Sequence, residues 1–289
     1  MVETPTKHMN ATEQNKTEQK YCITFEKDVQ QAASRIQGVA HKTPVLTSQS
    51  LLSFNGKRYF YKVEAFQKTG SFKFRGALNA VKAELEKDKV TSPFPVVTHS
   101  SGNHAQALAL AAKLASTETR KVSATIVMPK NAPHVKKAAV QDFGGNIVMV
   151  ENTNEAREGE ADRIVASTGA SFIHPSEDPR VIAGQGTVCL EFVEQVKEMG
   201  EELDAVIIPV GGGGLASGNI ISLRALLGDK VKVRVEVMHR LLGITKRHYQ
   251  RLTHVFLQFS FLDYLGRTLE TGRRQTVVRR GQAPCASFR

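Results

Sequence analysis

The chain has 289 residues, 41% of them hydrophobic, and no long uninterrupted apolar run, which excludes a membrane-spanning protein and allows one large core or two modest ones. The formal net charge is +11, but ten basic and two acidic residues in 239–289 contribute +8 of it. The rest of the chain is nearly neutral, which excludes a nucleic-acid binder. Three distant cysteines, Cys22, Cys189 and Cys285, have no metal-ligand spacing and indicate a reducing compartment. We therefore expect a cytoplasmic protein.

The first part of the chain combines a polar tail with short elements. Residues 1–21 lack an apolar stretch that can act as a secretory signal, and we expect a disordered N-terminal tail. Apolar residues recur at helical spacing in 24–39 and again in 77–85. Between these two helices, the sequence predicts extended segments at 45–47 and 58–63.

Strands and helices alternate through the rest of the chain. Strands are expected at 96–98, 124–128, 147–150, 171–174, 204–210 and 231–237. The helices between them are expected to end near 115, to cover about 134–143, 161–167 and 215–227, and to open at 184–187 and run through 197. This alternation is typical of a parallel sheet covered on both faces.

Lys73 lies where the strand 58–63 leads into the helix 77–85. The local sequence from residue 68 is Lys-Thr-Gly-Ser-Phe-Lys-Phe-Arg-Gly-Ala. The free N–H groups and the positive dipole end of a helix N-terminus lower the pKa of a nearby lysine and attract anions. Most lysines at a helix start are simply solvated, so this position alone leaves both interpretations open.

Four consecutive glycines, Gly211 to Gly214, separate an expected buried strand from a helix. Without Cβ atoms the backbone can approach an anion closely, and the N–H groups of the turn can hold a phosphate. A flexible turn is the alternative. The spacing to Gly218 and the position of Glu236 fit a dinucleotide fingerprint poorly, so a single phosphate is the better ligand.

A second strand-to-helix junction reads Ser-Ser-Gly-Asn-His over residues 100–104. Its N–H groups can bind another anion, although composition alone also allows a plain helix cap. His99 and His104 have no acidic partner at metal-ligand spacing, so we predict no metal site here.

These three motifs, in this order, resemble those of the fold-type II pyridoxal-phosphate enzymes, which include serine racemase, the serine and threonine dehydratases and the tryptophan synthase β family. The resemblance covers residues 22 to 233. It implies an α/β fold of two parallel-sheet, three-layer domains. The large cofactor-binding domain would combine 22–92 with 175–238, and the small domain would be 93–174.

The resemblance also assigns roles to the motif residues. Lys73 would bind pyridoxal 5'-phosphate as a Schiff base and then remove the α proton of the substrate. Asn103 would contact the 3'-oxygen of the cofactor. The cofactor phosphate would rest on Gly211, Gly212, Gly213, Gly214 and Leu215. The substrate carboxylate would be held by Ser100, Ser101, Gly102, Asn103 and His104. Ser101 would also face the substrate opposite the lysine, as in serine racemase, where many threonine dehydratases have alanine.

The implied function is that of a serine racemase, a serine/threonine dehydratase (ammonia-lyase), or both, acting on L-serine or L-threonine as a homodimer. Two alternatives stay open. A catalytically impaired, truncated member of the family would pair with a complete subunit. A nucleotide-binding Rossmann protein would use Gly211 to Gly214 for a nicotinamide cofactor.

Several positions depart from the family pattern. ATP and Mg²⁺ are possible ligands with incomplete sites. The residues Ser48, Lys68, Thr69 and Gln106 match the nucleotide site of serine racemase, but Gln49, Ser50 and Ser176 do not. The Glu-Pro pair that binds a divalent cation in racemase-like members is displaced, so we assign no metal ligand. Residues 239–289 match nothing in the family, and we expect an alternative or out-of-frame ending.

Overall fold

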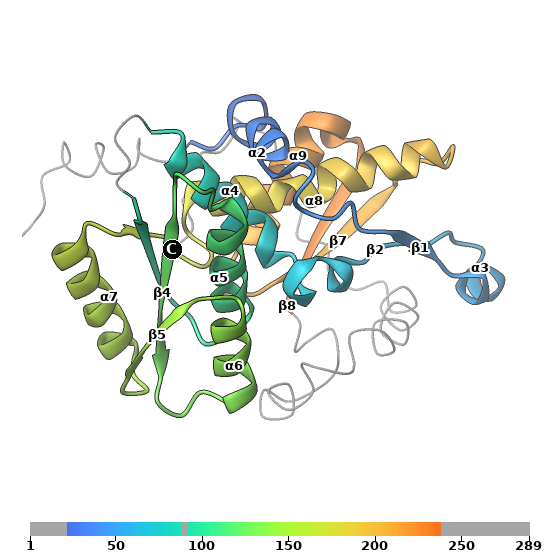
Figure 1. Cartoon of the computed structure of the whole chain (residues 1–289). Coiled ribbons are helices and arrows are strands. Elements are labelled where there is room, and N and C mark those ends of the chain that lie inside the picture. The colour runs from blue at the N-terminus through green and yellow to red at the C-terminus, as the bar shows by residue number, and fades with distance from the viewer. Residues whose placement is uncertain (1–21, 88–91, 238–289) are drawn as a thin grey trace, which may run out of the picture.

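A computed structural model describes residues 22–87 and 92–237, and the two predicted tails, 1–21 and 239–289, lie outside these residues. Four parallel strands form a sheet in the order β5-β4-β3-β6. The strands are β3 (Phe94–His99), β4 (Val122–Pro129), β5 (Asn146–Val150) and β6 (Ser171–Phe172). They are connected by α5 (Asn103–Ala115), α6 (His134–Asp142) and α7 (Asn154–Thr168). Helix α7 covers one face, and α5 and α6 cover the other (Figure 1). The prediction of a doubly covered parallel sheet is therefore confirmed.

The two faces of this sheet contribute to two separate cores. Val96 and Ile126 belong to a cluster with α4 (Lys73–Leu85) and α5, whereas Val97 and Val127 belong to a cluster with α7. Neighbouring residues of a strand point to opposite faces, which explains the division. All four side chains are fully buried. Because both faces are apolar, these strands are continuous apolar runs in the sequence.

Helix α4 lies in the middle of the molecule and packs on both α5 and α8 (Pro179–Glu198). Its residues from Phe74 to Val81 are all buried. A helix buried on several sides cannot tilt or slide without opening a cavity. The first residue of α4 is Lys73, so the packing of α4 fixes the main-chain position of the predicted reactive lysine.

The remaining elements pack around α8. Helix α9 (Gly214–Leu227) lies along α8, beside η1 (Phe25–Val29) and α2 (Gln30–Ile36). Strands β7 (Ala205–Val210) and β8 (Lys232–Val237) pair in parallel, and β1 (Val45–Thr47) pairs antiparallel with β2 (Phe60–Lys62). The two short strands and α3 (Gln49–Asn55) extend away from the body (Figure 1). No helix within 22–87 and 92–237 is long and apolar enough to cross a membrane.

The predicted second parallel sheet is present only as separate strand pairs in the described part of the chain. The four-stranded sheet is continuous, but β1-β2 and β7-β8 are two isolated pairs. The connection from β1 to β2 contains only the short helix α3, and short connections favour antiparallel pairing. The fold is thus α/β with one four-stranded parallel sheet, and the division into two domains stays a prediction.

Two helices begin earlier than the sequence patterns predicted. Helix α7 begins at Asn154 because the Thr153 hydroxyl accepts a hydrogen bond from Ala156 N at 3.1 Å, so the acidic stretch before residue 161 is already helical. Helix α8 begins at Pro179, five residues before the predicted start. Asp178 caps it through Arg180 N at 2.9 Å, and proline suits the first helical position.

Helices α8 and α9 approach each other through glycines. A Cβ atom built on Gly218 would lie 2.2 Å from the Ile182 carbonyl oxygen, which is backbone and cannot move aside. We expect Gly218→Ala to lower the free energy of unfolding by about 2–4 kcal/mol in urea titrations. Gly159 in α7 has nothing within 4 Å of such an atom, and Gly159→Ala should stabilise by about 1 kcal/mol. Equal effects of the two substitutions would contradict this packing.

Candidate active site

Lys73 stands at the start of α4, after two short 3-10 turns, Glu64–Phe66 and Lys68–Gly70. Its side chain is half-buried. The Nζ atom donates a hydrogen bond to the Pro175 carbonyl oxygen at 2.6 Å, and it lies 5.3 Å from the centroid of the Phe72 ring. The predicted position of Lys73 at a helix N-terminus is confirmed, although the two turns separate it from β2.

Burial lowers the pKa of Lys73 to about 8. The sequence argument attributed such a shift to the helix dipole, but desolvation of the ammonium is the cause that the structure gives. Among the described residues, no carboxylate forms an ion pair with this lysine. A substantial fraction of the amine is therefore neutral near pH 8, as a nucleophile or general base requires.

The turn at residues 174–177 joins the lysine to the glycine loop, defined here as Gly211–Gly214. Pro175 provides the carbonyl that accepts from Lys73, and Ser176 lies against the loop. A Cβ on Gly212 would lie 2.7 Å from Ser176 Oγ, and one on Gly214 would lie 2.8 Å from Ser176 O. Only glycine can approach the turn this closely. Two motifs that are far apart in sequence thus meet through one turn.

The glycine loop leads from the end of β7 at Val210 into α9, which begins at Gly214. Gly213 has a φ of 87°, a conformation that residues with a side chain rarely adopt. Gly211 and Gly212 are exposed, and Cβ atoms on Gly211 and Gly213 would meet nothing within 4 Å. The loop therefore presents bare backbone beside open space at a helix N-terminus, which fits a phosphate group. Leu215 follows in the first turn of α9.

The second junction, residues 100–104, connects β3 to α5. Ser100 Oγ accepts from Gly102 N at 3.3 Å, and Gly102 is the N-cap of α5. Ser101 is half-buried, whereas Asn103 is exposed as the first residue of α5. Neither side chain forms a hydrogen bond with another described residue. The strand-to-helix junction is confirmed, and the predicted roles of Ser101 and Asn103 stay predictions.

His104 is a buried, neutral residue close to Lys73. It is 2% exposed, and burial, followed by the positive charge of Lys73, lowers its pKa to about 3. Its Nε2 lies 3.2 Å from the Ile173 carbonyl, so Nε2 carries the proton and donates. Nδ1 then has a free lone pair and no hydrogen-bond partner among the described residues. His104 can accept a hydrogen bond but offers no charge to a carboxylate.

Several other buried polar atoms around Lys73 lack a described partner. Besides His104 Nδ1, these are Thr69 Oγ1, Ser71 Oγ and Thr98 Oγ1. An unpaired buried polar atom costs about 1–3 kcal/mol unless water or a ligand supplies the missing hydrogen bond. Such a concentration of unpaired groups on the lysine loop and its neighbours fits a polar molecule bound next to Lys73.

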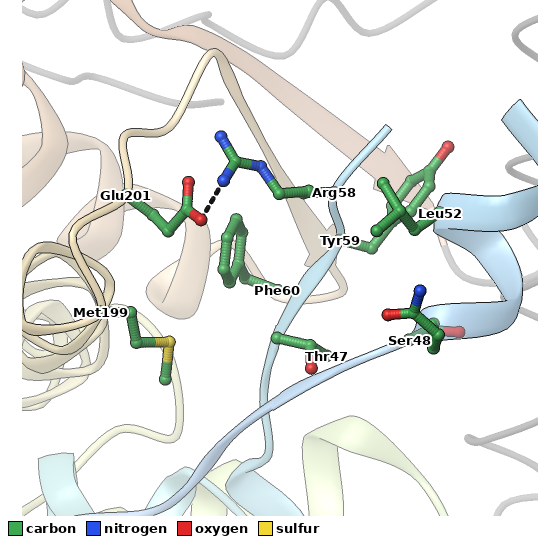
Figure 2. A pocket seen from close by; sticks show the side chains of 9 residues that line it. Thr47, Ser48, Leu52, Arg58, Tyr59, Phe60, Met199 and Glu201 are labelled. Atoms are coloured by element: carbon green, nitrogen blue, oxygen red, sulfur yellow. Dashed lines mark hydrogen bonds and ion pairs between the residues drawn. The ribbon is translucent and has the colours of Figure 1, made fainter. Parts of the chain in front are cut away.

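A pocket of about 210 Å³ lies elsewhere, between the β1-β2 pair, α3 and the end of α8. Figure 2 shows the Arg58–Glu201 ion pair beside the Phe60 ring in this pocket. Ser48 and Gln49 line it, but the three motifs do not. Within the described residues, no group of three or more His, Cys, Asp or Glu residues is arranged to hold a metal ion.

Sequence reasoning missed the residues that support the site. The Arg75 guanidinium is fully buried and pairs with Glu64 and Glu191. A single arginine among the apolar residues of α4 is a usable signal, because a buried charge needs a partner. The contacts of Pro175 and Ser176 gave no such signal, since they are made by the main chain or across long sequence separations.

An α/β fold with a half-buried lysine at a helix start and a phosphate-sized glycine loop defines a candidate pyridoxal-phosphate enzyme. The model of the pyridoxal-phosphate dependent enzyme family matches residues 36–258, and the chain belongs to this family. The match ends inside the segment 239–289 that was predicted to lie outside the family. The resemblance inferred from the three motifs is confirmed.

Individual relatives agree with this assignment. Serine racemase of Rattus norvegicus is 48% identical over 206 residues, which are 71% of this chain and 59% of that protein. The solved serine racemase of Dictyostelium discoideum has a TM-score of 0.67 and 40% identity, covering 77% of this chain and 70% of its own. A solved bacterial-type relative, the threonine deaminase of T.th., has a TM-score of 0.64 and 39% identity, covering 78% of this chain and 68% of its own. The chain thus spans about 59% of the length of the rat relative.

Proposed function

We propose that the chain is a pyridoxal-phosphate enzyme that acts at the α-carbon of L-serine or L-threonine, by racemisation, by loss of ammonia, or by both. The observation that carries the proposal is the Lys73 amine, which burial keeps partly neutral and which lies one turn away from the glycine loop. Serine racemase and threonine deaminase among the relatives support the choice of substrate. Family membership removes the reason for the nucleotide-binding alternative.

The proposed cofactor contacts are the Lys73 amine, the Asn103 side chain and the main chain of Gly211 to Leu215. When bound, pyridoxal phosphate supplies an electron sink that makes the α proton of an amino acid removable. The open backbone of Gly211 and Gly213 and the unpaired polar atoms around Lys73 fit such a ligand. ATP, Mg²⁺, a homodimer and a cytoplasmic location stay predictions.

The residues of the chain would divide the proton transfers between two sides of the substrate. Lys73 Nζ, once neutral, takes the α proton on its own side. The N–H groups of residues 100–104, at the start of α5, orient the substrate carboxylate. Ser101 Oγ returns a proton from the opposite side in racemisation, and loss of the β-hydroxyl gives a keto acid and ammonia instead.

Ser101→Ala separates these two outcomes. We expect formation of D-serine from L-serine to fall by about 100-fold or more, because no group returns the proton from the second side. Formation of pyruvate should continue, since elimination needs no such proton. Chiral chromatography and a coupled pyruvate assay on the same samples measure both products. A parallel loss of both products would contradict the role given to Ser101.

The proposed function itself is tested by incubating the pyridoxal-phosphate-loaded protein with L-serine and, separately, with L-threonine. D-serine, pyruvate or 2-oxobutyrate is the expected product. Protein treated with borohydride before the assay should form none of them, which gives a matched control. Bound cofactor without any of these products would favour the alternative of a catalytically impaired partner subunit.

A further inference from the structure

His174 stabilises the turn at 174–177 through a single nitrogen atom. Its Nδ1 accepts two main-chain hydrogen bonds, from Ser176 N at 3.2 Å and from Glu177 N at 2.9 Å. Asparagine, aspartate and serine usually fill this role in turns, by accepting from the N–H groups two or three residues later. A histidine used in this way holds the turn only while Nδ1 is unprotonated.

The surroundings of His174 keep it in that form. Burial lowers its pKa, and the nearby His99 and Lys73 lower it further, whereas Glu177 and Glu158 act in the opposite direction. The ring is half-buried beside His99 and Phe172, with centroid distances of 5.6 Å and 6.1 Å. The neutral ring with its proton on Nε2 leaves Nδ1 free to accept both hydrogen bonds.

The same turn forms contacts in two other directions. Its Pro175 carbonyl accepts from Lys73 Nζ at 2.6 Å, and its Ser176 packs on Gly212 and Gly214. A shift of the turn would therefore move the acceptor of the lysine and the support of the glycine loop together. No other hydrogen bond of Lys73 Nζ is present among the described residues, so this carbonyl alone orients the amine.

We propose that His174 is a positioning residue, whose Nδ1 fixes the 174–177 turn and thereby holds the Lys73 amine in its half-buried place beside the glycine loop. The proposal rests on the proposed function for its catalytic meaning, but the effect on Lys73 exists in the protein without cofactor. A purely structural cap would change stability and leave the reactivity of Lys73 unaltered, so that reactivity decides between the two roles.

Two amide variants separate the position of the acceptor from polarity and size. In His174→Asn, the side-chain oxygen takes the place of Nδ1 and can accept the same two hydrogen bonds. In His174→Gln, the acceptor lies one bond farther out and cannot. His174→Ala removes the acceptor, and His134→Ala, at an exposed histidine in α6, is the matched control.

The measurement is the rate of reductive methylation of Lys73 in cofactor-free protein from pH 6 to 11, read by peptide mass spectrometry. Wild type, His174→Asn and His134→Ala should share one midpoint, near pH 8. In His174→Gln and His174→Ala, the released turn admits water to the amine, and the midpoint should rise by about one pH unit, a tenfold change in its protonation equilibrium. The midpoint, unlike the absolute rate, does not depend on access of the reagent.

The outcomes are distinct from those that test the proposed function. An unchanged midpoint in His174→Gln would overturn the proposal, and so would a raised midpoint in His174→Asn equal to that of His174→Gln. If His174→Ala does not fold, as judged by thermal unfolding, the asparagine and glutamine variants decide the question. Failure of wild-type protein to process L-serine would count against the proposed function and would leave the methylation result standing.

Discussion

Lys73→Ala is expected to abolish covalent retention of pyridoxal phosphate and to lower turnover of L-serine by about 1,000-fold or more. Nucleophilic and acid-base roles both need an amine at this place. The Lys73 amine is held by one carbonyl, and burial brings its pKa to about 8. A lysine with the ordinary pKa of 10.5 would be neutral far less often at the same pH. Removing the side chain removes both functions at once.

The measurement combines a spectrum with a peptide map. Wild-type protein incubated with pyridoxal phosphate and then borohydride should carry a stable pyridoxyl label on the peptide that contains Lys73. Lys113→Ala, at an exposed lysine of α5, should keep both the label and the activity. Lys73→Arg keeps a positive charge near the Pro175 carbonyl and should still lose the label. A label on another lysine in wild-type protein would refute the assignment of Lys73.

The parts of the fold that were predictable are those written in local patterns. The strands β3, β4 and β5 are continuous apolar runs, and each is followed by a helix, so their parallel pairing follows from the alternation. The position of Lys73 at the start of α4 was predictable for the same reason. A run of four glycines between a strand and a helix likewise indicates its own use.

What could not be predicted depends on contacts between distant segments. The pairing of Lys73 with Pro175 joins residues 102 positions apart, and the acceptor is a main-chain carbonyl that any residue possesses. The cause of the lowered lysine pKa is burial, which depends on the whole fold rather than on the helix that contains the lysine. The early starts of α7 and α8 depend on the caps Thr153 and Asp178, which only a structure distinguishes from ordinary loop residues.

Arg75 is the most constrained charged residue that the sequence did not reveal. Its guanidinium forms paired hydrogen bonds with Glu64, both at 2.8 Å, and with Glu191, at 2.7 Å and 2.9 Å. Lys62 adds a bond to Glu191 at 2.8 Å. The group ties α4 to the turn that precedes the lysine loop and to α8. Two positive and two negative side chains balance each other away from water.

Arg75→Leu is expected to lower the free energy of unfolding by about 3–5 kcal/mol, because it leaves two carboxylates in a largely buried place with one remaining cation. Urea titration of the cofactor-free protein measures the loss. Arg163→Leu, which removes an exposed ion pair with Glu160 on α7, is the matched control and should barely move the urea midpoint. Similar midpoints for the two variants would show that burial of the Arg75 group contributes nothing.

The pH dependence of that loss identifies its electrostatic origin. Burial by itself would raise the pKa of Glu191, but the hydrogen bonds from Arg75 outweigh it and hold the pKa below the ordinary value of 4.5. A carboxylate with a lowered pKa in the folded state stabilises above its unfolded pKa, and this stabilisation is lost as the pH falls through the folded pKa. In Arg75→Leu the lowering interaction is gone, so the variant has less to lose in acid. We therefore expect the difference in unfolding free energy between wild type and Arg75→Leu to be full at pH 7 and to shrink as the pH falls below 4.5, whereas a defect caused only by lost packing would stay constant.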